Sequence, residues 1–290
     1  MYVNDIVDNL FSLTRLFADD SSLSVTSNDI KEIEVIINYD LHQISKWAKQ
    51  WMVNFNPNKT EAMFFSNTIN EYPKVAFDNV NINFVPHHKH LGVTLSDDCK
   101  WQLHISNIIK SASKVLSSMR LLKFKLSRNT LNNIYITYMR PLLEYASVVW
   151  DGCSQNDKEK LEKLQHEAAR IVTGLTKSTS IQKLLQEIGW VSLTDRRTIN
   201  KLTIMYKHRH NELPSYLHDI LTDQIAERTR YNLRNNDNYE TIVRRTELFN
   251  QSFVPSAVTL WNNLEENIRS SPSLTNFELK LNRRLFLDIS

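Results

Sequence analysis

The pattern of apolar and polar positions predicts a β-hairpin near the N-terminus. Two short apolar runs, Leu13–Phe17 and Leu23–Val25, flank the segment Ala18-Asp19-Asp20-Ser21. Short apolar-rich runs on either side of a polar tetrapeptide are typical of two paired strands. The turn of this hairpin is therefore expected to carry two adjacent carboxylates.

A long amphipathic helix is predicted after the hairpin. Apolar residues recur at spacings of three or four from Ile30 to Trp51, and Ser27 or Asn28 is placed to act as the N-cap. Asn56-Pro57-Asn58 then breaks the helix. Four short runs follow, separated by clusters of Asn, Pro and His, and they predict the antiparallel strands of a small sheet at residues 62–65, 74–77, 82–85 and 91–95.

The remainder of the chain has a helical pattern. Helices are predicted at residues 105–122, 131–149, 161–171, 181–188, 193–206, 255–264 and 274–287. Pro141 predicts a kink or a break in the second of these, and Gly174 follows the third helix where a C-terminal cap belongs. The polar segment from Arg228 to Asn238 is expected to be extended. Together these patterns predict an α+β chain.

Composition excludes several classes of protein. With 290 residues, 41% of them hydrophobic, the chain can bury a sizeable core, and its length favours two domains. Only four glycines are present, and they form no Gly-rich phosphate loop. Cys99 and Cys153 cannot build a disulfide framework or a zinc ribbon, which indicates an intracellular protein. No apolar run of about 18 residues and no signal-peptide pattern occurs, so no membrane partner is expected.

Charge is distributed unevenly along the chain. Residues 1–100 hold 8 Lys and Arg against 13 Asp and Glu, whereas residues 101–290 hold 27 against 19. The stretch from Cys99 to Leu143 contains no acidic residue, and its basic residues are Lys100, Lys110, Lys114, Arg120, Lys123, Lys125, Arg128 and Arg140. A basic segment beside an acidic block is typical of a polyphosphate-binding lobe next to a cation site. A solvated basic helix face is the alternative interpretation.

The tetrapeptide Phe17-Ala18-Asp19-Asp20 is the strongest candidate for chemistry. Two adjacent carboxylates on a tight turn repel each other unless a cation lies beside them, and Mg²⁺ prefers carboxylate oxygens together with substrate phosphates. The alternative is an ordinary exposed turn, because Asp is common in turns. The residues that follow favour the metal interpretation.

Those residues resemble, in order and spacing, the reverse transcriptases of non-LTR retrotransposons, particularly the jockey and CR1-like clades. The matching segments are Phe17-Ala18-Asp19-Asp20, Trp47-x-x-x-Trp51, Phe55-Asn56-Pro57-Asn58-Lys59-Thr60, Lys89-His90-Leu91-Gly92-Val93, Trp101-x-x-His104, Arg140-Pro141-Leu142-Leu143-Glu144-Tyr145, Gln165-x-x-Ala168-Ala169-Arg170, Tyr231-Asn232-Leu233-Arg234 and Ser252-Phe253-x-Pro255 with Trp261-Asn262. The resemblance extends over nearly the whole chain.

The resemblance implies a partial right-hand polymerase. Residues 1–98 would form part of the palm, an antiparallel sheet with a long helix; residues 99–175 a helical thumb; and residues 176–290 a mostly helical extension. The implied function is metal-dependent addition of deoxynucleotides to a primer on an RNA template. The implied ligands are Mg²⁺, or Mn²⁺ in its place, an RNA template, a DNA primer and deoxynucleoside triphosphates.

Individual roles follow from the same resemblance. Asp19 would coordinate the catalytic ions, with Asp20 in support, and Lys59 would approach the incoming triphosphate. The segment His90 to Val93 would be the primer grip, with His90, Leu91 and Gly92 contacting nucleic acid. The remaining nucleic-acid contacts are implied for Phe17, Lys100, Lys110, Lys114, Arg120, Lys123 and Lys125.

The chain also departs from the family pattern. Such polymerases use a further metal-binding aspartate on an earlier palm strand, and the opening Tyr2-Val3-Asn4-Asp5-Ile6 resembles a segment that follows that strand, so Asp5 is not this ligand. The fingers and the N-terminal part of the palm would then be supplied as partners. Little polymerase activity is expected from these residues alone. The alternative function is a non-catalytic nucleic-acid-binding or scaffolding remnant of a retroelement.

Two further residue sets are weaker candidates. His87, His88 and His90 have no Cys or carboxylate close in sequence to complete a metal site, so a polar loop is the favoured interpretation. The six tryptophans are interpreted as core or interface residues rather than base-stacking platforms. They are Trp47, Trp51, Trp101, Trp150, Trp190 and Trp261.

Overall fold

The computed structural model describes residues 4–56, 59–66, 71–221 and 238–287. The chain divides into two compact units, Met1–Lys100 and Trp101–Ser290. Each unit has its own buried apolar residues, and the second contains two separate apolar clusters. Helices combined with small two-stranded sheets confirm the α+β class.

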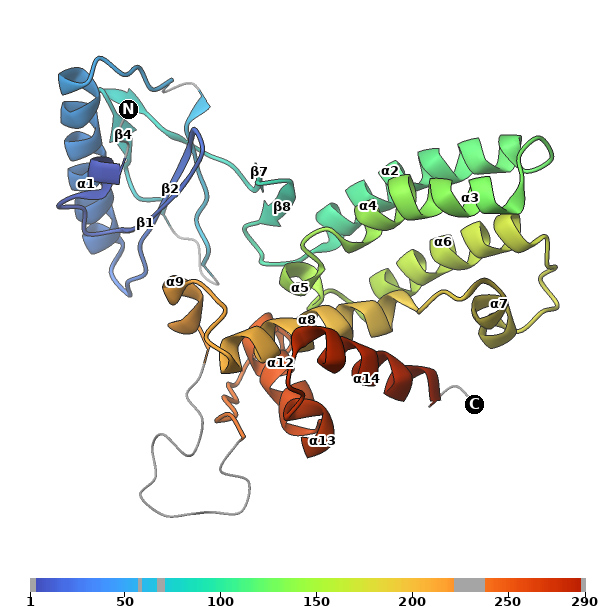
Figure 1. The fold of residues 1–290 in the computed structure, drawn as a ribbon. Coiled ribbons are helices and arrows are strands. Elements are labelled where there is room, and N and C mark those ends of the chain that lie inside the picture. Colours follow the sequence, from blue (N-terminus) through green and yellow to red (C-terminus); the bar gives the residue numbers. More distant parts are fainter. Residues whose placement is uncertain (1–3, 57–58, 67–70, 222–237, 288–290) are drawn as a thin grey trace, which may run out of the picture. The chain divides into compact units, whose positions relative to one another are not determined.

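The first unit contains the predicted hairpin and the long helix (Figure 1). Strands β1 (Leu13–Phe17) and β2 (Asp20–Ser24) pair antiparallel, with Phe17 opposite Asp20. Helix α1 spans Ile30–Gln50 and buries Leu41 and Ile44 against the strands that follow it. Both predicted elements are therefore confirmed.

The N-cap prediction for α1 is wrong by one or two residues. Asp29, with extended dihedral angles, accepts a hydrogen bond from the backbone N–H of Lys31 at 2.9 Å. Ser27 instead accepts a hydrogen bond from the Asp29 N–H at 3.0 Å, and its hydroxyl donates to Glu32. Consecutive polar residues before a helix all have capping oxygens, and the backbone path selects the one that reaches the free N–H groups.

The expectation of one small antiparallel sheet is wrong. The described strands form separate two-stranded pairs, and one of these pairs is parallel. They are β3 (Glu61–Ala62) with β6 (Asn83–Phe84), β4 (Ala76–Phe77) with β5 (Val80–Asn81), and β7 (His87–His90) with β8 (Val93–Ser96). Runs interrupted every few residues by Asn, Asp and Pro do not extend far enough to pair on both sides.

The second unit begins with a group of helices packed around one apolar cluster (Figure 1). Its helical elements are α2 (Gln102–Leu122), α3 (Arg128–Ile134), η3 (Tyr135–Met139), α4 (Arg140–Glu144), α5 (Ser147–Trp150), α6 (Gln155–Thr173) and α7 (Ile181–Ile188). Element η3 is a π-helix that ends directly before Arg140-Pro141, and the helical run breaks again at Tyr145. The irregularity predicted from Pro141 is thus confirmed, as is Gly174, which caps α6 with a φ of 75°.

The remaining helices build a second apolar cluster. They are α8 (Leu193–Arg209), α9 (Ser215–His218), α11 (Glu247–Asn250), α12 (Phe253–Asn262), α13 (Glu266–Arg269) and α14 (Leu274–Leu287). Met205, Trp261 and Phe277 are fully buried in this cluster. Most of the segment expected to be extended, Arg228 to Asn238, lies outside the described residues, including Tyr231-Asn232-Leu233-Arg234. Among the helices that the structure describes, none is long and apolar enough to cross a membrane.

A buried ion cluster connects α8 to the residue after α5. Asp151 lies 2.7 Å from Nε of Arg197 and 2.5 Å from Nζ of Lys201, and Lys158 lies 3.3 Å away. The side chains of Arg197 and Lys201 are only 2% and 5% exposed. Buried cations of this kind need a carboxylate partner, because isolated charges are strongly disfavoured away from water.

Candidate functional site

The two candidate metal ligands lie at the tip of the β1–β2 hairpin. Asp19 is in the turn and Asp20 is the first residue of β2, and both side chains are exposed. Ala18, before them, has a φ of 53°, a left-handed conformation that is uncommon for a residue other than glycine. The tight turn therefore presents both carboxylates to solvent without an interposed residue.

A buried aspartate on α1 holds the start of this hairpin. Asp40 is fully buried and accepts hydrogen bonds from the backbone N–H groups of Phe11 at 2.9 Å and Ser12 at 2.7 Å. Sequence reasoning missed this residue. The available signal was a carboxylate on the apolar stripe of an amphipathic helix, three residues after Ile37 and four before Ile44. An acid at such a position is expected to have a specific buried partner.

The carboxylate pair fits Mg²⁺ chemically but is an incomplete ligand set. Mg²⁺ is commonly bound through one or two carboxylates together with water and substrate phosphates. Within the described ranges, no group of three or more His, Cys, Asp or Glu residues is placed to hold a metal ion. Asp19 and Asp20 would thus hold the ion only together with oxygen ligands from elsewhere.

Lys59 lies in the short connection after α1. Its side chain is exposed, and its backbone N–H donates to the carbonyl of Asn56 at 3.0 Å. Among the ion pairs of the described residues, Lys59 joins neither Asp19 nor Asp20. The residues immediately before it, 57 and 58, lie outside the described part. The suggested role of Lys59 toward a triphosphate therefore stays a prediction.

The expected primer-grip segment forms the turn between β7 and β8. His90 pairs with Val93, which leaves Leu91 and Gly92 as a two-residue turn with φ values of 45° and 82°. Positive φ at both central positions is the requirement of a type I′ hairpin turn. For leucine this conformation costs about 1–2 kcal/mol. Backbone strain of this kind often occurs at functional sites, so the turn is a good candidate for a contact with a ligand.

The polar-loop interpretation of the histidine cluster is wrong, because His87–His90 form strand β7. His88 lies 2.7 Å from a carboxylate oxygen of Glu61, and His87 contacts the Ser96 hydroxyl at 3.1 Å. Glu61 is 27 residues away along the chain and was therefore missed by a search of nearby positions. These contacts join β7 to its neighbours and explain the histidines without a ligand.

Several basic residues of the Cys99–Leu143 stretch form ion pairs with carboxylates from other parts of the sequence. Arg120 lies 3.3 Å from Glu167, and Arg128 lies 2.8 Å from Glu187. Lys100, which belongs to the first unit, pairs with Asp98 at 3.2 Å. All three carboxylates lie outside the Cys99–Leu143 stretch, so a count of charges within that stretch did not include them. They neutralise part of its positive charge.

Four lysines of the segment keep their charge uncompensated. Lys110 and Lys114 are exposed on α2, spaced four residues apart on one face, and α2 contains no acidic residue. Lys123 and Lys125 are exposed in the turn that follows α2. None of the four has a carboxylate within ion-pair distance among the described residues. The uncompensated basic residues of this segment are thus two lysines on α2 and two in the turn that follows it.

Most of the tryptophans are core residues, as expected. Trp150 and Trp261 are fully buried, and Trp190 stacks on Tyr135 with ring centroids 3.7 Å apart. Trp51 is the clear exception, with 44% of its surface exposed. Its ring lies 6.5 Å from that of Trp47.

Comparison with known proteins identifies relatives among mobile-element polymerases. The chain is 25% identical over 214 residues to the RNA-directed DNA polymerase from mobile element jockey of Drosophila melanogaster, which covers 73% of this chain and 23% of the relative. It is 27% identical over 165 residues to the jockey polymerase of Drosophila funebris, covering 56% of this chain and 18% of the relative. A probable RNA-directed DNA polymerase from transposon X-element of D. melanogaster is 24% identical over 201 residues, or 68% of this chain and 22% of the relative.

The chain spans less than a quarter of the length of these relatives. No protein-family model and no solved structure matches it significantly. The similarity nevertheless covers 56–73% of this chain in four separate relatives. The resemblance predicted from the sequence segments is thereby confirmed: the chain is similar in sequence to RNA-directed DNA polymerases of jockey-like non-LTR retrotransposons.

Proposed function

We propose that this chain is the part of a retroelement RNA-directed DNA polymerase that holds the primer and template and supplies two of the metal-binding carboxylates. The observation that carries the proposal is the exposed pair Asp19 and Asp20 on a hairpin turn, in a chain related to such polymerases over most of its length. Residues 1–98 would act as part of the palm, residues 99–175 as the thumb and residues 176–290 as a helical extension.

Each residue would contribute a distinct step to deoxynucleotide addition. When bound, Mg²⁺ or Mn²⁺ neutralises charge on the attacking and leaving oxygens. Asp19 would hold the ion through a carboxylate oxygen, and Asp20 would support it. Adjacent residues at the start of a strand project in different directions, so one of the two is expected to matter more. Lys59 would neutralise the phosphates of the incoming nucleotide.

The outer face of the hairpin supports a partner role for the remaining polymerase. Leu13 and Phe17 lie on the exposed side of β1 with Arg15 between them, and Phe11 before the strand is also exposed. Exposed apolar side chains gathered on one face commonly mark an interaction surface. We propose that fingers and further palm residues cover this face and provide the missing oxygen ligand.

Binding of an RNA–DNA duplex is expected to fall steeply with salt. If the four uncompensated lysines on α2 and its turn each contact a phosphate, affinity should drop roughly 100-fold between about 50 and 200 mM salt. Fluorescence anisotropy with a labelled duplex measures this slope. Changing Lys110 and Lys114 together to Gln should lower the slope by about two, whereas Lys183→Gln on α7 should leave it unchanged. A flat salt dependence would contradict the thumb assignment.

Primer extension by the chain alone is expected to give no incorporation. With an oligo(dT)-primed RNA template and Mg²⁺ or Mn²⁺, the native chain and Asp19→Asn should both be inactive, because two carboxylates do not complete the metal site. Asp19→Asn should bind the duplex as tightly as the native chain does. Incorporation that disappears in Asp19→Asn would show instead that other residues of this chain complete the site.

A second candidate function is a non-catalytic nucleic-acid-binding or scaffolding protein derived from a retroelement. The incomplete ligand set among the described residues favours it. The two functions differ in one measurement, namely primer extension after addition of the separately purified fingers and N-terminal palm of a related polymerase. Activity restored by that addition and lost in Asp19→Asn supports the polymerase role. Duplex binding that survives EDTA, without restored activity, supports the binding role.

A further inference from the structure

An almost fully exposed phenylalanine lies in the turn between α2 and α3. Phe124 is 88% exposed and is flanked by two exposed lysines, Lys123 and Lys125. The turn is well defined, since the N–H groups of Lys125 and Leu126 both donate to the carbonyl of Leu122, at 2.9 and 3.0 Å. A large aromatic ring held this far into water has no stabilising role within the described part of the chain.

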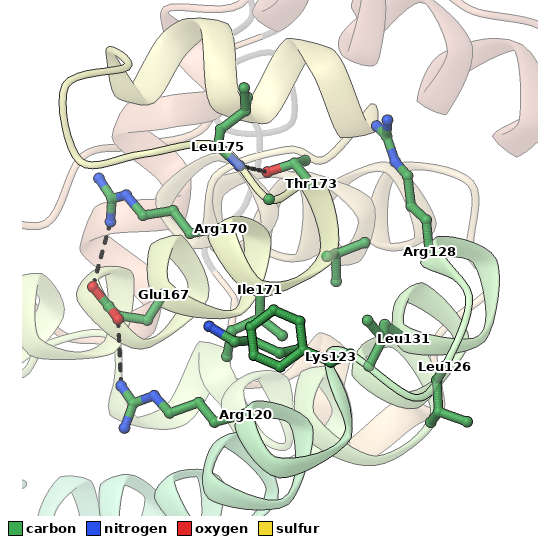
Figure 2. Close-up of a pocket in the computed structure, with 13 residues that line it drawn as sticks. Arg120, Lys123, Leu126, Arg128, Leu131, Glu167, Arg170, Ile171, Thr173 and Leu175 are labelled. Carbon is green, nitrogen blue, oxygen red and sulfur yellow. Dashed lines mark hydrogen bonds and ion pairs between the residues drawn. The ribbon is translucent and has the colours of Figure 1, made fainter.

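A pocket of about 610 Å³ opens beside this turn, within the range of volumes that ligand pockets have (Figure 2). Its walls come from the end of α2, the start of α3 and the end of α6. Apolar and positively charged side chains both line it, and Phe124 is among them. The charged and aromatic residues of its lining are Arg120, Lys123, Phe124, Arg128, Glu167 and Arg170.

The lining of the pocket has an excess of positive charge. Four of its residues are cationic and Glu167 is its one anionic residue, while Arg128 also pairs with Glu187 outside the lining, at 2.8 Å. Figure 2 shows Glu167 between two arginines, 3.3 Å from Arg120 and 3.5 Å from Arg170, so that one carboxylate serves two guanidinium groups. Nε of Arg170 is buried and makes no hydrogen bond to any described residue. An anionic group entering the pocket would meet Lys123, which has no ion pair among the described residues, and two guanidinium groups that share a single carboxylate.

The cationic and aromatic groups are close enough to act on one ligand. Nζ of Lys123 lies 4.6 Å from the centroid of the Phe124 ring. An aromatic face next to a lysine is the combination that binds single strands, in which the base stacks on the ring and its phosphate meets the cation. A base inside a duplex has both faces covered by its neighbours, so away from duplex ends an unpaired base is needed for stacking on Phe124.

We propose that this pocket binds an unpaired nucleotide of a nucleic-acid strand, with the base on Phe124 and the phosphate near Lys123, Arg120 and Arg170. The inference rests on the proposed nucleic-acid role of the second unit and adds to it a site for single-stranded RNA or DNA. An apolar protein segment is a poorer occupant, because it would leave the excess positive charge of the lining without a counter-charge.

The test compares single-stranded and duplex probes with the full chain. Fluorescence anisotropy would use 12-nucleotide oligo(U), 12-nucleotide oligo(dT) and a blunt RNA–DNA duplex made of two separate strands. Phe124→Ala should weaken binding of the single strands roughly 5- to 100-fold and change duplex binding less than about twofold. Phe124→Trp should retain single-strand affinity. Leu121→Ala, which removes another highly exposed side chain one helical turn away, serves as the matched control and should have no effect.

The outcomes separate this inference from the proposed function. Single-strand binding that is unchanged in Phe124→Ala, or reduced equally for the duplex, overturns the pocket assignment alone. Failure of the native chain to bind the duplex, with single-strand binding that still depends on Phe124, overturns the proposed function alone, and failure to bind any of the three probes overturns both. Comparison of oligo(U) with oligo(dT) shows whether the pocket takes RNA, DNA or both.

Discussion

Replacing Asp151 by alanine is expected to lower the free energy of unfolding of the second unit by about 3–5 kcal/mol. The substitution removes the carboxylate that lies against Arg197 and Lys201, both nearly inaccessible to water. Arg197 retains a distant carboxylate, Glu162 at 3.9 Å, and Lys201 retains only a hydroxyl contact with Ser256 at 2.9 Å. Two buried cations without a close counter-charge account for the size of the expected loss.

Urea unfolding followed by circular dichroism measures this loss, and an exposed ion pair provides the control. Glu187→Ala removes the partner of Arg128 at the surface, where such pairs contribute about 0–1 kcal/mol. Replacing Asp151, Arg197 and Lys201 together by Leu, Met and Met should recover most of the stability. Equal effects of Asp151→Ala and Glu187→Ala would show that the buried cluster is not a major source of stability.

The same carboxylate makes the stability of this unit sensitive to acid. Burial alone raises the pKa of Asp151, but the hydrogen bond and charge of Lys201, with the charges of Lys158 and Arg197, outweigh burial and hold the pKa below its ordinary value. The pKa of Asp151 is lower in the folded chain than in the unfolded chain. The stabilisation is therefore complete at a pH above the pKa of the unfolded chain, and it is lost as the pH falls through the pKa of the folded chain. Below about pH 4 the free energy of unfolding of the native chain should therefore fall toward that of Asp151→Ala, which lacks this carboxylate at every pH.

Replacing Trp261 by alanine is expected to cost about 3–5 kcal/mol, the second large effect. The ring is fully buried in the second apolar cluster, with the rings of Phe277 and Tyr239 at centroid distances of 6.0 and 6.3 Å. These neighbours come from α14 and from a segment before α11, and they cannot close over the space that the indole leaves without moving whole elements.

Hydrogen exchange and urea unfolding test this prediction without relying on tryptophan fluorescence. Trp261→Phe should cost less, because it keeps most of the buried ring. Trp51→Ala serves as the control, since that ring is half-exposed in the first unit and its loss should cost less than about 1 kcal/mol. A loss from Trp51→Ala as large as that from Trp261→Ala would contradict the proposed role of the cluster.

The sequence alone predicted most elements that depend on neighbouring residues, although it misplaced the N-cap of α1 and took the strand His87–His90 for a loop. The hairpin that presents Asp19 and Asp20, the long helix after it and the helices from Gln102 onward follow from hydrophobic spacing. Pro141 and Gly174 act where predicted, because a missing N–H and a positive φ are properties of single residues. Family segments likewise pointed to the relatives that the comparisons found.

Only the tertiary structure could reveal the contacts between residues far apart in the sequence. It pairs β3 with β6 in parallel and brings the Asp40 carboxylate to the backbone N–H of Ser12. It also brings Glu167 to Arg120, which is 47 positions away in a stretch of the sequence that contains no acidic residue. Periodicity reports which face of an element is buried, whereas the partner on the other side depends on how distant elements pack. For this reason the sequence determined the elements and the candidate carboxylates, and the fold determined which charges remain available to a ligand.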